Sequence, residues 1–166
     1  MLLYKLTDTK GQTKYGTQWG VGVTHNKPVV ANPTLCSDEV LHAYTSPLLA
    51  VLMNPAHAAF SVPRLWEAIG EVVVSDGTKV GVFQLTTTKE ISLPIITAKQ
   101  QTRFAILCAL EVYKDSKFKQ WAERWLSGKD RSRKAAYAAA YAANAAANAA
   151  AIIDFADLAK RSMDAY

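Results

Sequence analysis

The amino-acid sequence predicts an α+β protein in which an antiparallel β-sheet comes first and helices follow. Up to about residue 94, short apolar runs are broken by glycine and proline, which is typical of short antiparallel strands. Past Pro94 the apolar spacing changes from about two residues to about 3.6, the period of an α-helix. We expect residues 1–94 and 95–166 to form one domain, since 166 residues with 50% apolar content suffice for one core.

The first part contains a strand, a loop, a short helix and a hairpin. "MLLYKLT" reads as a strand, and the glycines at 16, 20 and 22 lead into a loop, "THNKPVVANPT". Ser46 can cap a short buried helix that has Pro47 at its first position and ends at Asn54 and Pro55. "PRLWEAIGEVVV" and "KVGVFQLTTTKEI" flank "SDGT", which predicts a hairpin and the most secure strand pair.

Two amphipathic helices are expected after the sheet. Thr97 followed by Gln100 fits a capping box, which predicts a core helix from there to about Tyr113. A second helix is expected near 116–126, with Gly128 placed to end it. Apolar residues at helical spacing mark the packed faces: Phe104, Leu107, Cys108 and Leu110 in the first helix, and Phe118, Trp121, Ala122, Trp125 and Leu126 in the second.

Residues 135–151 hold 13 alanines in 17 positions and predict a long helix over 133–160. One alanine buries little surface, but its small side chain lets a neighbouring helix approach closely. Tyrosine and asparagine interrupt the alanines at four-residue and three-residue steps, and would fix the register of such a contact. We therefore expect an oligomerisation helix that packs against copies of itself. A low-complexity tail that does not dock is the alternative.

The net charge of +5 is local, because residues 114–134 carry eight Lys or Arg against three acidic residues. Such a stretch can attract an anionic ligand, nucleic acid or an acidic partner, although a solvated helix surface is its more common meaning. A nucleic-acid-binding module is not favoured, because the tryptophans of the same stretch indicate that one side of the helix is buried.

The sequence shows no catalytic pattern, metal site or cofactor motif. The three histidines, at 25, 42 and 57, have no ligand spacing, and "GTQWGVG" lacks the helix start and lysine of a phosphate-binding loop. Glu67 and Glu71 would share one strand face, which is more typical of an exposed edge than of acid–base catalysis. Cys36 and Cys108 lie in apolar contexts and are expected to be buried, reduced thiols, which favours a reducing cytosol. No apolar run approaches membrane-spanning length.

Isolated basic residues beside aromatic rings indicate a binding site. Arg103, one residue before Phe104, is suited to bidentate capture of a phosphate, or else pairs with an acidic neighbour. Arg64 and Trp66 should project to the same side of a strand, where they could offer a ligand a cation and a stacking surface. In the alternative interpretation, Trp66 is a core residue and Arg64 is a charge at the edge of the sheet. Three further candidates adjoin the glycine-rich loop and could contact a base and a phosphate: Gln18, Trp19 and Lys27. For Trp19, packing in the core is the simpler role. Together they predict a small anionic aromatic ligand such as a nucleotide.

The sequence resembles the phage-encoded Thoeris anti-defence sponges of the first described class over roughly residues 1–131. The resemblance is carried by "LCSDEVLHAY", "LLAVLMNPAHA", "PRLWEA" and "RFAILCALEVY", while the alanine-rich end is similar in composition only. It implies a non-enzymatic protein that binds a cyclic ADP-ribose isomer, such as glycocyclic ADP-ribose, in the cytoplasm of an infected bacterium. It further implies a homo-oligomer, a dimer or a hexamer built as a trimer of dimers, with sites between subunits and, in some relatives, a second site for cyclic di- or trinucleotides.

By this resemblance Arg103 stands where the diphosphate-binding arginine is expected, and Arg64 is the candidate basic residue of a second pocket. The "SDGTKVG" hairpin would act as a lid over the ligand. The rival function is a phage enzyme that processes a similar nucleotide, either a hydrolase or an ADP-ribosyl-acting protein.

Overall fold

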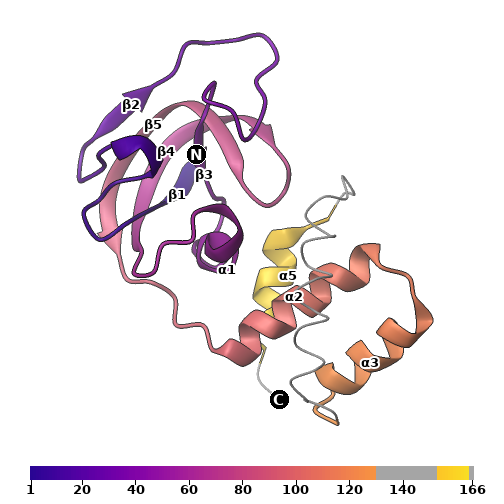
Figure 1. Cartoon of the computed structure of the whole chain (residues 1–166). Coiled ribbons are helices and arrows are strands. Elements are labelled where there is room, and N and C mark those ends of the chain that lie inside the picture. Colours follow the sequence, from indigo (N-terminus) through magenta and orange to yellow (C-terminus); the bar gives the residue numbers. More distant parts are fainter. Residues whose placement is uncertain (130–152, 165–166) are drawn as a thin grey trace. The chain divides into compact units, whose positions relative to one another are not determined.

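The structure is a computed structural model that describes residues 1–129 and 153–164, and it confirms the α+β class (Figure 1). The chain divides into two compact units, Met1–Ile95 and Ile96–Tyr166. Their boundary falls next to the change of period at residue 94, and one domain for the whole chain stays a prediction. Among the described helices, none is long and apolar enough to span a bilayer.

The first unit is built on a five-stranded antiparallel sheet. Its strands are β1 (Leu2–Thr7), β2 (Thr24–Asn26), β3 (Leu41–Ala43), β4 (Arg64–Ser75) and β5 (Val80–Ile91), and a short 3-10 helix, η1, spans Lys14–Gly16. The order is β1-β4-β5-β2, and β3 also pairs with β5. Tyr4 and Tyr44 exchange backbone hydrogen bonds of 2.8 and 2.9 Å, so the chain after β3 returns to β1 and the sheet curls around its core.

The predicted hairpin is the longest strand pair of the sheet, β4 with β5. Its turn is held by Asp76, whose Oδ1 accepts hydrogen bonds from the backbone N–H groups of Thr78 and Lys79 at 2.8 and 2.9 Å. Gly77 takes a positive φ of 82°, which glycine adopts without steric cost. These bonds fix the conformation of the turn itself, and movement of the hairpin as a lid stays a prediction.

The core of the first unit lies on the inner face of the curled sheet. It consists of Leu3, Trp19, Leu41, Ala43, Ala68, Val80, Val82 and Leu85. Helix α1 (Pro47–His57) packs against β1 and buries Leu49, Ala50, Leu52 and Met53. Strands β1, β3, β4 and β5 all contribute residues to this core.

Helix α1 begins as predicted and ends later than predicted. Ser46 accepts the cap hydrogen bond from the backbone N–H of Leu49, and Pro47 occupies the first turn. The expected end at Asn54 and Pro55 is wrong, because the helix continues to His57. Asn54 holds the final turn: its carbonyl accepts from Ala58 at 3.0 Å, and its side-chain amide exchanges two hydrogen bonds with the backbone of Phe60. These bonds stabilise the final turn although Pro55 cannot donate a backbone hydrogen bond.

The second unit contains helices α2 (Ala98–Val112), α3 (Ser116–Leu126) and α5 (Phe155–Ser162). The capping box of Thr97 and Gln100 is present, and α3 has the predicted bounds. Gly128 follows α3 at a φ of 79°, the conformation that ends a helix. Helix α2 contacts both α3 and α5, and the α2–α3 core is formed by Ile106, Ala109, Phe118, Ala122 and Trp125.

The predicted alanine-rich helix over 133–160 lies largely outside the described residues. Its expected continuation to Lys160 without a break is wrong, because Ile153 and Asp154 are not helical. Asp154 instead caps a new helix, α5, by accepting a hydrogen bond of 2.9 Å from the backbone N–H of Asp157. An aspartate at the N-cap satisfies one of the unpaired N–H groups of a helix start, which favours a boundary here.

Replacing Gly81 with alanine should destabilise the first unit. A β-carbon at Gly81 would lie 2.7 Å from both Val40 Cγ2 and Val74 Cγ1, so the core must shift. We expect Gly81→Ala to lower the free energy of unfolding by about 1–3 kcal/mol, measured by urea denaturation. Gly20→Ala is the matched control, because a β-carbon there meets nothing closer than 3.6 Å. Equal unfolding free energies for the two variants would contradict the packing described here.

Candidate functional site

Arg64 and Trp66 lie together at the start of β4, as predicted. The Arg64 guanidinium carbon is 4.7 Å from the centroid of the Trp66 ring, within the range of a cation–π contact. The ring itself is only 3% exposed, and its Nε1 donates a 3.0 Å hydrogen bond to Thr7 Oγ1. Trp66 is therefore a core residue that also supports the guanidinium. Because the ring is buried, Arg64 is the accessible member of the pair.

Glu90 on β5 holds the guanidinium of Arg64. The arginine Nε donates to Glu90 Oε1 at 2.8 Å and its Nη2 donates to Oε2 at 2.5 Å, a bidentate arrangement. Both side chains remain partly exposed, at 34% and 42%. These hydrogen bonds raise the pKa of Arg64 and lower the pKa of Glu90. The sequence reasoning missed Glu90, because the pair depends on the strand register.

An irregularity in the hairpin places Glu90 on the same face as Arg64. Between the turn and Ala68, the two residue numbers of each pair add up to 155, apart from a local shift at Val72. From Glu67 to the outer end of the hairpin they add up to 156, so the register shifts by one residue. Thr88 is the extra residue, and its Oγ1 donates to the carbonyl of Glu67 at 3.3 Å. Directly opposed residues share a face, so pairing with Trp66 puts Glu90 beside Arg64. Without this shift Trp66 would face Lys89 instead.

Gln18 approaches Arg64 across the turn at Gly11. The Gln18 side-chain amide donates to the carbonyls of Lys10 and Trp19 at 3.0 and 3.1 Å. A β-carbon at Gly11 would lie 2.9 Å from Gln18 Nε2 and 3.5 Å from Arg64 Nη1. The absent side chain and the positive φ of 77° at Gly11 thus allow the turn to approach both polar groups.

Trp19 is a core residue, as its simpler interpretation predicted. It is 2% exposed, and its Nε1 donates to Thr13 Oγ1 at 3.2 Å. The Nζ atom of Lys5 lies 4.9 Å from the centroid of the Trp19 ring and donates to the carbonyl of His42 at 2.6 Å. Burial lowers the pKa of Lys5 to about 8. This lysine was missed, although a lysine in the apolar strand "LLYKLT" is the signal that could have indicated it.

Lys27 and Arg103 are not part of the contacts around Arg64 just described. Lys27 follows β2, and its backbone N–H donates to the carbonyl of Phe83 at 2.7 Å. Arg103 lies on α2 in the second unit, where its Nε donates to the carbonyl of Arg161 at 3.0 Å. Arg103 therefore links α2 to α5, and a ligand-binding role for it or for Lys27 stays a prediction.

A second polar cluster lies near the C-terminal end of α1 and was not predicted. Tyr44 Oη and His57 Nδ1 are 3.1 Å apart, and the backbone N–H of Cys36 donates to His42 Nε2 at 3.2 Å. Lys79 Nζ is 2.9 Å from Cys36 Sγ. Burial, with smaller contributions from nearby lysines, lowers the pKa of both histidines to about 4. Both imidazoles are therefore neutral at pH 7, and no group of three or more metal-ligating side chains occurs among the described residues.

The two cysteines differ in their environments. Both are free, as predicted, and Cys108 is buried, which raises its pKa to about 12. The expectation that Cys36 is also buried is wrong, because it lies in a loop and is exposed. Its φ of 65° is a turn conformation that side chains rarely adopt.

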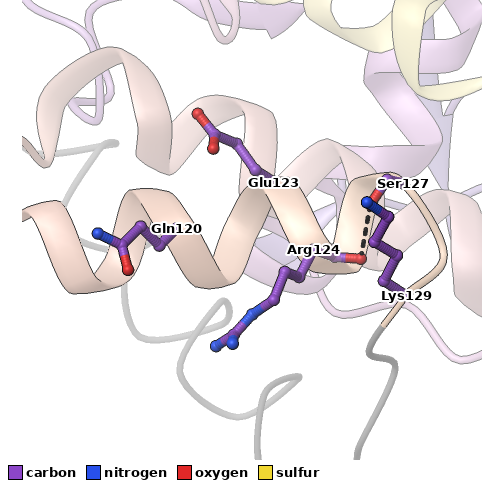
Figure 2. A pocket seen from close by; sticks show the side chains of 5 residues that line it. All are labelled: Gln120, Glu123, Arg124, Ser127 and Lys129. Carbon is purple, nitrogen blue, oxygen red and sulfur yellow. Dashed lines mark hydrogen bonds between the residues drawn. The ribbon is translucent and has the colours of Figure 1, made fainter.

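The basic stretch contributes a hollow of about 430 Å³ on the C-terminal half of α3, shown in Figure 2. It is lined by Gln120, Glu123, Arg124, Ser127 and Lys129. Ser127 donates to the carbonyl of Arg124 at 3.1 Å. The lining carries both signs of charge and no aromatic ring.

Comparison with known proteins found no matching family model, no matching curated protein and no matching solved structure.

The two half-buried histidines, His42 and His57, should make the first unit acid-labile. Their pKa values of about 4 lie below the usual 6.5, so between pH 6.5 and 4 the unfolded chain binds protons that the folded chain does not. Stability should therefore fall as the pH falls through this window. Urea denaturation at pH 7, 5.5 and 4.5 measures the effect.

A double variant, His42→Asn with His57→Gln, provides the comparison. It removes both titrating imidazoles and should lose stability less steeply than the unmodified protein over the same pH range. An unchanged pH dependence in this variant would contradict the assignment to these histidines.

Proposed function

We propose that this protein binds a cyclic ADP-ribose isomer and sequesters it without cleaving it, so that a Thoeris effector is not activated in an infected bacterium. The observation that carries the proposal is the Arg64 guanidinium, which lies over the Trp66 ring and is partly open to solvent. An arginine in this position presents a planar set of N–H donors that matches the oxygens of a diphosphate.

The contact with Trp66 improves Arg64 as an anion site. An arginine side chain loses considerable rotamer freedom when it binds, and a guanidinium already resting on a buried ring loses less. Hydrogen bonds to a charged group contribute about 1.5–3 kcal/mol. That range corresponds to roughly one to two factors of ten in affinity. The contribution suits a sponge, which must compete with an effector for a scarce signal.

The resemblance to the anti-defence sponges also supports the proposal. Its four quoted segments fall on β3 and the loop before it, on α1, on the start of β4, and on α2. They therefore include Arg103, which the resemblance assigns to the diphosphate, and Arg64, which it assigns to a second pocket. The assignment of the diphosphate to Arg64 rests on the geometry around Trp66 instead. Binding of cyclic di- or trinucleotides at a second site is part of the same proposal.

Self-association through the alanine-rich segment completes the proposed function. Sites formed between subunits would enclose a ligand that a small subunit cannot enclose alone. Light scattering at micromolar concentration is expected to give the mass of an oligomer. A monomer of 18.1 kDa would remove this part of the proposal.

Arg64→Ala should weaken binding of the cyclic ADP-ribose isomer by roughly ten- to a hundredfold. The variant removes the charge-assisted hydrogen bonds, and isothermal titration calorimetry measures the change. Arg124→Ala is the matched control, since it removes an exposed arginine from the basic stretch. A larger loss for Arg124→Ala than for Arg64→Ala would place the ligand on the basic stretch instead.

Arg103→Ala is expected to weaken ligand binding and to leave the oligomer intact. Because Arg103 also joins α2 to α5, the variant should in addition lower the free energy of unfolding by about 1 kcal/mol. Calorimetry and urea denaturation separate the two effects. Unchanged affinity would remove Arg103 from the site while leaving its structural role.

The fate of the ligand distinguishes a sponge from a nucleotide-processing enzyme. After incubation and heat denaturation of the protein, chromatography should recover the cyclic ADP-ribose isomer unmodified and in full. Recovery of an opened or cleaved nucleotide would favour the enzyme.

A further inference from the structure

We infer that Glu90 is an internal competitor for the anion site of Arg64, and that a ligand diphosphate binds by displacing its carboxylate. The inference rests on the proposed function and adds a mechanism of selectivity to it. In the structure, the Glu90 carboxylate thus occupies the anion site of Arg64.

The geometry of the pair matches the arrangement that a phosphate would adopt. Glu90 uses both carboxylate oxygens on Nε and Nη2 of Arg64, along one edge of the guanidinium. A phosphate group offers two oxygens at a similar spacing and forms the same bidentate contact. A phosphate that approaches this edge therefore competes with Glu90 for the same N–H groups of Arg64.

Displacement requires little rearrangement. Glu90 is 42% exposed, so its carboxylate can rotate into solvent. The contact of the guanidinium with Trp66 does not involve Glu90, so it can remain when the carboxylate leaves. Only one flexible side chain has to move, and the strands stay as they are.

The position of Glu90 is a specific product of the strand register. The extra residue Thr88 moves Glu90 opposite Trp66, where Lys89 would otherwise lie. Bulges often occur beside functional sites, where they redirect a side chain. Here the bulge replaces a cation beside Arg64 with an anion.

An internal carboxylate makes the site selective for ligands with more than one negative charge. A monoanion exchanges one bidentate contact for another and gains little. A diphosphate carries more negative charge than the Glu90 carboxylate and is attracted more strongly to Arg64, so it displaces Glu90 more readily. The inferred competition therefore favours a diphosphate over single carboxylates and chloride.

The test compares Glu90→Gln with the unmodified protein by isothermal titration of inorganic pyrophosphate and of cyclic ADP-ribose. Glutamine has the same size but no charge, so the competing anion is lost. Exposed ion pairs contribute roughly 0.2–1 kcal/mol, which corresponds to an affinity increase of up to about fivefold for both probes. Circular dichroism confirms that the variant is folded.

Glu71→Gln is the matched control, because it makes the same charge change on the same sheet, on β4 instead of β5. Glu71 is exposed and lies seven residues from Arg64, about 23 Å along an extended strand. Its effect on affinity should be well below that of Glu90→Gln. An equal increase in both variants would overturn the inference, since net charge alone would explain it.

The remaining outcomes separate the inference from the proposed function. If the unmodified protein binds cyclic ADP-ribose but Glu90→Gln binds it no more tightly, Glu90 is not a competitor and the proposed function stands. If neither protein binds either probe, the proposed site at Arg64 fails, and the inference fails with it.

Discussion

The register between β4 and β5 determines which side chains meet at the surface of the sheet. Because Thr88 is an extra residue, the outer part of the hairpin is offset by one position from the part near the turn. A one-residue offset moves every following side chain to the opposite face. Glu90 joins Arg64 and Trp66 only with this offset, so the Arg64–Glu90 pair depends on it.

Trp66 connects that surface to the core. Its ring is buried and hydrogen-bonded to Thr7 on β1, while its face supports the guanidinium of Arg64. The pairing of β1 with β4 places Arg64 opposite Thr7, so the indole of Trp66 reaches a hydroxyl on the neighbouring strand. The core thus fixes the position of a charged group at the surface, and a binding site needs this kind of preorganisation.

Local signals in the sequence predicted the hairpin and helices α1, α2 and α3, whereas β2 lies inside the stretch expected to be a loop, so that expectation is wrong there. The Asp-Gly turn, the capping box at Thr97 and the glycine at 128 act within a few residues, and each was confirmed. The predicted end of α1 was wrong, because the Asn54 side chain stabilises a final turn that Pro55 alone would weaken. The N-cap at Asp154 could have been read from the sequence, but the continuous spacing of apolar residues concealed it.

The candidate site was predicted only in part, for a physical reason. Arg64 and Trp66 are two residues apart on one strand, so their meeting follows from strand geometry alone. Glu90, Lys5 and the cluster of Tyr44, His57 and Cys36 depend on pairings between distant segments, and no local pattern specifies these. The core position of Trp19 was predicted correctly, whereas the contact of its ring with Lys5 became evident only from the fold.

The central claim is that Arg64 receives the diphosphate of a nucleotide that the protein leaves intact. A crystal structure of the protein grown with a cyclic ADP-ribose isomer tests it most directly. The account predicts an uncleaved ligand with a phosphate oxygen within hydrogen-bonding distance of Arg64 and with the Glu90 carboxylate turned away. A ligand bound elsewhere, with the Arg64–Glu90 pair unchanged, would contradict it.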